Sequence, residues 1–318
     1  MYSDQISMAI TTEQMLENER NGKLSALLTV EGGEACQGDI GKLHYLYEQG
    51  VRMMTLTWNF PNELGYPNID MEKKMRLEGI TITDVEKAMT AEGAPNTDSS
   101  RKFSPYIPDT VHGLTRTGIE FVREMERIGM IIDVSHLSDA GFYDVLNNTA
   151  KPFVASHSNA RAVCPFVRNL TDDMIRRLGE RGGVTGLNYC RDFLFTEKEI
   201  KGMDDEIAAK QGSSNNNVSN YQKFHQKKIM VEKYTDMIYS KIAEHARHIV
   251  NVGGMGVLGL GSDFDGIPAY VGMPEADQLD HLAHAFHKQG FTDGQIEDIF
   301  YGNVMRVYKE VLKQGISL

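Results

Sequence analysis

The sequence predicts a parallel α/β fold in which strands alternate with helices. Six short runs of apolar and β-branched residues occur along the 318-residue chain, and each leads through a turn into sequence with helical periodicity. Nearly continuous apolar runs are typical of strands that are buried on both faces of a parallel sheet. Two architectures follow from this alternation, an open doubly wound sheet and an eight-stranded barrel. The six strands are expected at residues 25–30, 52–57, 130–134, 152–155, 183–188 and 257–261.

Amphipathic segments between these runs predict the helices. The clearest covers residues 117–128, where Phe121, Met125 and Ile128 fall on one face. Ser138, Thr171 and Thr292 stand where an N-cap is expected, since their side chains can accept a hydrogen bond from the first turn. The other helices are expected at 39–48, 138–147, 171–181, 221–250, 277–288 and 292–313.

Two segments interrupt the alternation. Residues 59–112 are rich in Pro, Gly, Asn and charge and follow a strand directly, which indicates a long loop or subdomain insertion over the substrate. Residues 211–220 have the composition of a flexible polar loop. We expect residues 1–318 to form a single domain that carries the 59–112 insertion.

Composition narrows the class of partner. The chain has 33 Lys and Arg against 44 Asp and Glu, a net charge of −11, with no basic cluster for nucleic acid or an anionic membrane. No apolar run approaches the roughly 20 residues that cross a bilayer, and the N-terminus lacks the pattern of a secretory signal. These features predict a cytoplasmic protein that acts on a small molecule, with homo-oligomerisation left open.

Polar residues suited to catalysis follow four of the predicted strands. Glu31, His136, His157 and Asp263 each come directly after an apolar run, and the carboxyl ends of parallel strands converge on one face. Zinc binds imidazole nitrogen and carboxylate oxygen and lowers the pKa of bound water toward ~7. The pattern therefore indicates a metal-dependent hydrolase, with Glu31, His136 and His157 as ligands and Asp263 as the acid/base.

Each assignment has a structural alternative. A lone histidine after a strand is more often a hydrogen-bonded core residue, and Glu31 could cap the next element. Arg161 could clamp a substrate carboxylate or form a structural salt bridge. The three histidines spaced by three on the predicted helix 277–288 are expected to lie on a solvated face.

Several motifs resemble the membrane dipeptidase (renal dipeptidase) family of zinc peptidases, in its bacterial cytoplasmic branch. They are Val30-Glu-Gly-Gly, Leu56-Thr-Trp-Asn, Ile132-Asp-Val-Ser-His, Ala155-Ser-His-Ser-Asn-Ala-Arg and Gly261-Ser-Asp-Phe-Asp-Gly. Taken in order, the motifs are highly specific. The resemblance covers nearly all of the chain from about Lys23 onward.

The resemblance implies a (βα)8 TIM-barrel-like metallohydrolase that cleaves dipeptides, including those with a C-terminal D-residue, by attack of metal-bound hydroxide. It implies two zinc ions bridged by a carboxylate, which Glu31 matches, with His136 and His157 matching ligands of the second zinc. Asp263 matches the residue that moves the proton. Arg161 matches the residue that holds the substrate carboxylate.

The sequence departs from the family pattern at two places. No histidine is followed two residues later by Asp, so the family's His-x-Asp pair is absent and one zinc or fewer is expected. With six strands in place of eight, the fold is expected to be incomplete at the N-terminus, and the activity impaired or lost. Trp58 stands where mammalian members have a histidine, so Trp58 and Asn59 are expected to contact substrate. An amidohydrolase acting on another amide or a lactone is the alternative function.

Overall fold

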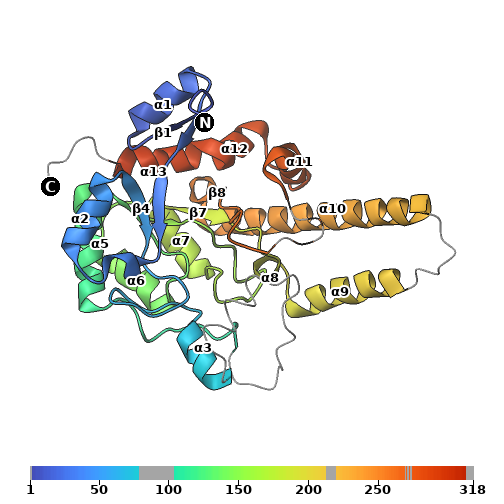
Figure 1. Ribbon diagram of the computed structural model, residues 1–318, viewed down its shortest axis with the longest axis horizontal. Coiled ribbons are helices and arrows are strands. Elements are labelled where there is room, and N and C mark those ends of the chain that lie inside the picture. The colour runs from blue at the N-terminus through green and yellow to red at the C-terminus, as the bar shows by residue number, and fades with distance from the viewer. Residues whose placement is uncertain are drawn as a thin grey trace.

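A six-stranded parallel sheet forms the centre of the protein (Figure 1). The computed structural model describes residues 2–78, 104–212, 220–268, 270, 272 and 274–312. The strand order is β3-β4-β5-β6-β7-β8, which follows the chain. All six predicted runs contain a strand of this sheet. The strands are β3 (Leu28–Glu31), β4 (Val51–Thr55), β5 (Ile131–Asp133), β6 (Val154–Ala155), β7 (Val184–Leu187) and β8 (Leu258–Leu260).

The N-terminal segment adds a small second sheet that the sequence did not predict. Strands β1 (Ile6–Met8) and β2 (Leu24–Ala26) pair in parallel, and helix α1 (Thr12–Arg20) connects them. The predicted strand 25–30 is divided, because β2 pairs with β1 while β3 pairs with β4. Three-residue strands carry too few residues to show a periodic pattern, which explains why β1 was missed.

Helices follow the strands as the alternation requires. Ser138, Thr171 and Thr292 each accept a hydrogen bond from the first turn of a helix, as predicted. Helices α9 (Glu197–Gly212) and α10 (Asn220–Gly253) extend together away from the sheet (Figure 1). An ion pair between Lys233 and Glu206 joins them. In chain order after β3, the α-helices as far as α11 are α2 (Ile40–Glu48), α3 (Met71–Glu78), α5 (Arg116–Ile128), α6 (Asp139–Asn148), α7 (Asp172–Glu180), α8 (Arg191–Leu194), α9 (Glu197–Gly212), α10 (Asn220–Gly253) and α11 (Leu279–Lys288).

Helix α5 shows how the pattern becomes structure. Phe121, Val122, Met125 and Ile128 are buried along one face, and the helix begins after the N-cap Thr115. It ends at Gly129, whose φ of 77° is readily adopted only by glycine. The apolar face packs into the main core beneath the sheet.

The predicted helix 292–313 is interrupted. Helix α12 (Asp293–Glu297) passes through a π-helical turn at Asp298–Gly302 into α13 (Asn303–Val311). Asn303 is buried and donates from Nδ2 to the carbonyls of Met255 and Leu258, each at 2.8 Å. These two bonds attach the helix to the start of β8, at the position where the helix changes from the π-helical turn to α13.

Strands β6, β7 and β8 approach one another closely at two glycines. A Cβ atom on Gly186 would lie 2.1 Å from the carbonyl oxygen of Ser156 and 2.8 Å from the Cα atom of Gly261. A Cβ atom on Gly261 would lie 1.9 Å from the same carbonyl oxygen. Both positions therefore require glycine at this strand spacing.

The sheet has the parallel, sequential strand order of a (βα) barrel wall, although β3 and β8 are not paired with each other among the described residues. The predicted insertion is described at 59–78 and 104–112, where it contains α3. Most of the predicted 211–220 loop lies outside the described residues. In the described part of the chain, no helix is both long and apolar enough to span a bilayer.

Candidate metal centre

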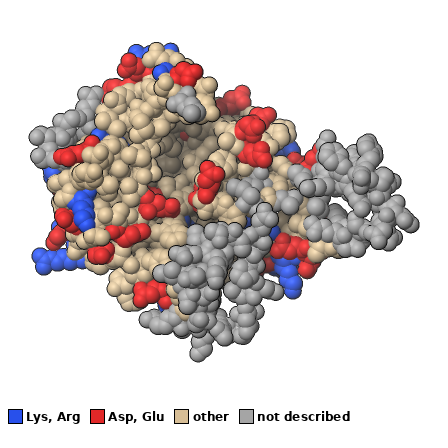
Figure 2. All heavy atoms as spheres, viewed as in Figure 1, with Lys and Arg blue, Asp and Glu red and all other residues tan. Residues whose placement is uncertain are grey.

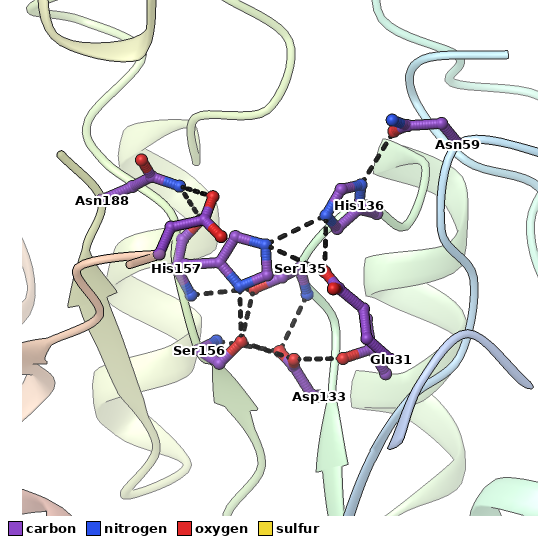
Figure 3. Close-up of polar contacts among 10 residues, drawn as sticks. Glu31, Asn59, Asp133, Ser135, His136, Ser156, His157 and Asn188 are labelled. Carbon is purple, nitrogen blue, oxygen red and sulfur yellow. Dashed lines mark hydrogen bonds and ion pairs between the residues drawn. The ribbon is translucent and has the colours of Figure 1, made fainter. Parts of the chain in front are cut away.

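Three predicted ligands converge at the carboxyl ends of β3, β5 and β6 (Figure 3). His136 Nε2 and His157 Nε2 lie 3.0 Å apart, and Glu31 Oε1 lies 3.1 Å from the first and 3.4 Å from the second. One ligand atom from each residue falls within 4.8 Å of the others. Glu31 lies 105 positions before His136, and His157 follows His136 by 21 positions. The parallel sheet brings the three residues together, as their positions after predicted strands indicate.

Both imidazoles are held neutral by their surroundings. Burial lowers the pKa of His136 well below its usual range, and the Arg168 guanidinium lowers it further. Burial also lowers the pKa of His157 to about 4, again with a contribution from Arg168. Burial raises the pKa of Glu31, and the nearby Asp263 and Asp133 raise it further.

This donor set fits a cation. Neutral imidazole nitrogens and a carboxylate oxygen are the ligands that zinc takes in proteins. Three such atoms at these separations would direct electron pairs at one another, and a cation between them removes that repulsion. The residues present therefore fit the metal ion that the fold family implies.

The second ring nitrogen of each histidine has its own partner. His136 Nδ1 lies 2.8 Å from Asn59 Oδ1, and His157 Nδ1 lies 2.7 Å from Ser156 Oγ. Asn59 was expected to contact substrate, but the structure places its amide oxygen on His136. Trp58 lies beside the same ring, with centroids 6.4 Å apart.

Two site residues have left-handed backbone conformations. His136 has a φ of 71° directly after β5, and Asp263 has a φ of 62° after β8. Such values are uncommon outside glycine and cost of order 1–3 kcal/mol, and they cluster at functional sites. The surrounding hydrogen bonds hold both side chains in place at this cost.

Asp263 is anchored at the opposite end of the sheet from Glu31. Its Oδ2 atom accepts a hydrogen bond of 3.0 Å from Asn188 Nδ2, and Asn188 is fully buried after β7. Asp263 acts electrostatically on both Glu31 and His157, so it lies within reach of the ligand cluster.

Arg161 forms a salt bridge, which is the structural alternative considered from the sequence. Its Nη1 and Nη2 atoms donate to the two carboxylate oxygens of Asp139, each at 2.7 Å. Nε and Nη2 also donate to the carbonyls of Asn169 and Val167. The carboxylate clamp assigned to Arg161 stays a prediction.

Arg168 is a cation that the sequence analysis did not assign to the site. Its side chain is only 4% exposed, and its Nε and Nη2 atoms are buried without a hydrogen-bond partner among the described residues. Burial lowers its pKa to about 10, opposed by Asp133, Asp263 and Glu31. The position seven residues after Arg161, in a loop, gave no signal to distinguish the two.

Elsewhere, acidic groups dominate the surface. Figure 2 shows a hollow in one face with Asp and Glu side chains on the surrounding surface, in keeping with the net charge of −11. His281, His284 and His287 are exposed on α11, as expected for a solvated helix face.

The sequence model of the membrane dipeptidase family (peptidase family M19) matches residues 1–92 and 72–316. A Klebsiella pneumoniae protein encoded in the pqqA 5′ region is 27% identical over 94% of this chain and 87% of its own length. An uncharacterized dipeptidase of Schizosaccharomyces pombe is 29% identical over 94% of this chain. The chain spans only 56% of that relative's length.

A solved metallopeptidase structure from Rhodobacter sphaeroides superposes with a TM-score of 0.70 at 24% identity. The match covers 98% of this chain and 70% of that one. That protein was crystallised with a phosphinate mimic of the dipeptide L-Ala-D-Ala. The similarity establishes the TIM-barrel-like fold.

Proposed function

Because the chain belongs to the membrane dipeptidase family, a family of peptide-bond hydrolases, we propose that it is a zinc-dependent dipeptidase. The observation that carries the proposal is the convergence of Glu31, His136 and His157 on one point. We propose that these three residues hold one zinc ion. The low pKa values of both histidines support this, since metal ligands must be unprotonated.

A bound zinc ion would supply an activated water and an electrophile for the scissile carbonyl. Asp263 is the candidate proton carrier, because it lies near the ligands without belonging to their cluster. Its Oδ2 is oriented by Asn188, which leaves the other carboxylate oxygen available to take a proton and deliver it to the leaving amine.

We assign the substrate carboxylate to Arg168 in preference to Arg161. A buried guanidinium with unused donors is costly, and a carboxylate ligand would satisfy it with a charge-assisted pair. The Arg161 guanidinium is already bound to Asp139. A cation beside the metal favours substrates with a free C-terminal carboxylate, as dipeptides have.

The stereochemical preference extends the proposal. The Rhodobacter metallopeptidase was solved with a mimic of L-Ala-D-Ala. We propose by analogy that this chain also accepts a D-residue at the C-terminal position.

The test is hydrolysis by the purified, zinc-loaded chain, followed by chromatography of the products. L-Ala-L-Ala and L-Ala-D-Ala should both be cleaved, chelation should stop the reaction, and zinc should restore it. Amidation of the substrate's C-terminus should reduce turnover strongly. A zinc-loaded chain that cleaves no free dipeptide, or one that cleaves amidated dipeptides equally well, would contradict the proposal.

A further inference from the structure

The metal centre has a second layer of hydrogen bonds that begins at a fully buried carboxylate. Asp133 Oδ1 accepts from the backbone amides of Ser135 at 3.0 Å and Ser156 at 2.8 Å. Asp133 Oδ2 accepts from the hydroxyls of Thr55 and Ser156, each at 2.6 Å. Asp133 therefore fixes the ends of β4, β5 and β6 and also fixes the direction in which the Ser156 hydroxyl points (Figure 3).

The direction of that hydroxyl determines the tautomer of His157. A serine hydroxyl has one proton, and the Ser156 proton is donated to Asp133. Only lone pairs of Ser156 Oγ remain for His157 Nδ1, which lies 2.7 Å away. Nδ1 must therefore carry the imidazole proton, so Nε2 presents a lone pair toward Glu31 and His136.

Asn59 acts in the same way on the other histidine by a different route. Its amide oxygen accepts from His136 Nδ1 at 2.8 Å, which places the His136 proton on Nδ1 and leaves Nε2 unprotonated. Asn59 itself is held by the chain, because its carbonyl accepts from the Met71 amide at 2.7 Å, where α3 begins. Two unrelated acceptors thus produce the same tautomer in both rings.

We propose that Asn59 and the Asp133-bound Ser156 are positioning residues that fix both imidazoles in the Nδ1–H tautomer before metal binds. This inference rests on the proposed metal site. Partners of this kind orient the ring and increase ligand basicity, and their loss typically costs 10–100-fold in metal affinity. Neither residue touches the ion; each acts through the histidine that it contacts.

The test measures metal binding rather than turnover, with Co2+ alone as an optical probe and Zn2+ as competitor. Asn59→Ala and Ser156→Ala should each weaken Co2+ binding by about 10–100-fold. Asn59→Asp keeps an acceptor oxygen at the same place and should bind within about threefold of the unaltered chain. Ser135→Ala is the matched control. Its hydroxyl lies 3.2 Å from Ser156 Oγ and accepts from the His157 backbone amide, but it has no bond to the ring.

A second measurement reads the tautomer directly. In the metal-free protein, nitrogen NMR shifts of His157 should report a proton on Nδ1, and Ser156→Ala should transfer part of the population to Nε2–H. A purely structural role would leave this distribution unchanged. Half-buried Asn59 provides the complementary variant if Ser156→Ala does not fold.

The outcomes separate this inference from the proposed function. If the unaltered chain binds neither Co2+ nor Zn2+, the metal site and the inference both fail. If the unaltered chain binds metal and the Asn59→Ala and Ser156→Ala variants bind it equally well, only the inference fails. Weakening by Ser135→Ala as large as that by Ser156→Ala would also overturn it, since the effect would then come from the network as a whole.

Discussion

The centre and the edges of the sheet contribute differently to the site. His136 and His157 follow the central strands β5 and β6, are buried, and are each held at the second ring nitrogen. Glu31 ends the edge strand β3, and its side chain is 47% exposed. Asp263 follows the other edge strand, β8, and is half-buried.

This difference separates two requirements of a metal hydrolase. Ligands that set the position of an ion benefit from rigidity, which buried hydrogen bonds to fixed partners supply. Groups that exchange protons with water and substrate need access to solvent. The central strands meet the first requirement through the two histidines, and the edge strand β8 meets the second through Asp263. The contrast can be tested by changing one region at a time.

The largest expected effect is on the central ligands. His136→Ala or His157→Ala should raise the zinc dissociation constant at least about 1000-fold, roughly 4 kcal/mol, because neither has an adjustable neighbour. Glu31→Gln at the exposed edge should cost about tenfold, roughly 1.4 kcal/mol. Competition with a chelator of known affinity measures both. Equal losses of zinc affinity in the histidine variants and in Glu31→Gln would contradict the distinction between central and edge strands.

At the other edge of the sheet, a change at Asp263 should lower turnover strongly without lowering the amount of bound zinc. Asp263→Asn should lower kcat/KM by about 1000-fold, within the range for loss of a general acid/base, and leave the zinc content unchanged. Asp265→Asn is the matched control, since Asp265 is exposed and shares the left-handed backbone conformation. Loss of zinc from the Asp263 variant would instead make that residue a ligand.

Stability at acid pH should depend on His245, a fully buried histidine of helix α10. His245 accepts from the Ala160 amide and donates to the Leu194 carbonyl, and burial lowers its pKa to about 4. The unfolded chain binds this proton near pH 6.5, so the stabilisation is present above pH 6.5 and is lost as pH falls to 4. The contribution of His245 to the free energy of unfolding should fall by about 3 kcal/mol over that range. His136 and His157 add losses of the same sign, since burial lowers their pKa values too.

Urea unfolding with chelator present, at pH 7 and pH 4.5, measures this loss. His245→Gln should flatten the pH dependence, whereas exposed His281→Gln should leave it unchanged. If the unfolding free energy of His245→Gln changed with pH as much as that of the unaltered chain, burial of this ring would not contribute to the loss of stability in acid.

The smallest expected effect distinguishes the two arginines of one loop. Arg168→Met should raise KM for free dipeptides about 30-fold, roughly 2 kcal/mol, with little change in kcat. Arg161→Lys should change KM by less than about twofold, because its partner is Asp139. Steady-state kinetics of both variants measure these changes in KM. A larger rise in KM for the Arg161 variant would favour Arg161 as the residue that binds the substrate carboxylate.

The sequence predicted the parts of the fold and site that depend on local pattern. Each of the six strands of the main sheet coincides with an apolar run that predicts it. Glu31, His136 and His157 stand at the ends of such runs and converge in the structure, while their role as metal ligands stays a prediction. The family and its TIM-barrel-like fold were recognised from the motifs around these residues, and the match to the family model confirms them.

Residues whose roles depend on long-range contacts could not be assigned. Nothing in the loop sequence shows that Arg161 is bound to Asp139, or that Nε and Nη2 of Arg168 have no hydrogen-bond partner among the described residues. The bond between Asn59 and His136 spans 77 positions, so no local pattern indicates it, and the predicted contact of Asn59 with substrate stays a prediction. The division at Leu27 between β2 and β3 likewise depends on which neighbour each strand pairs with.

The close approach of β6, β7 and β8 at Gly186 and Gly261 limits how this protein can evolve. A methyl group at either position would collide with the carbonyl of Ser156, the residue whose hydroxyl orients His157. Accommodating it would require the strands to separate and the metal centre to move with them. Substitutions in the loops beyond the strand ends can therefore alter substrate preference. Single substitutions at these two glycines cannot, because they would change the spacing of the strands beneath the metal centre.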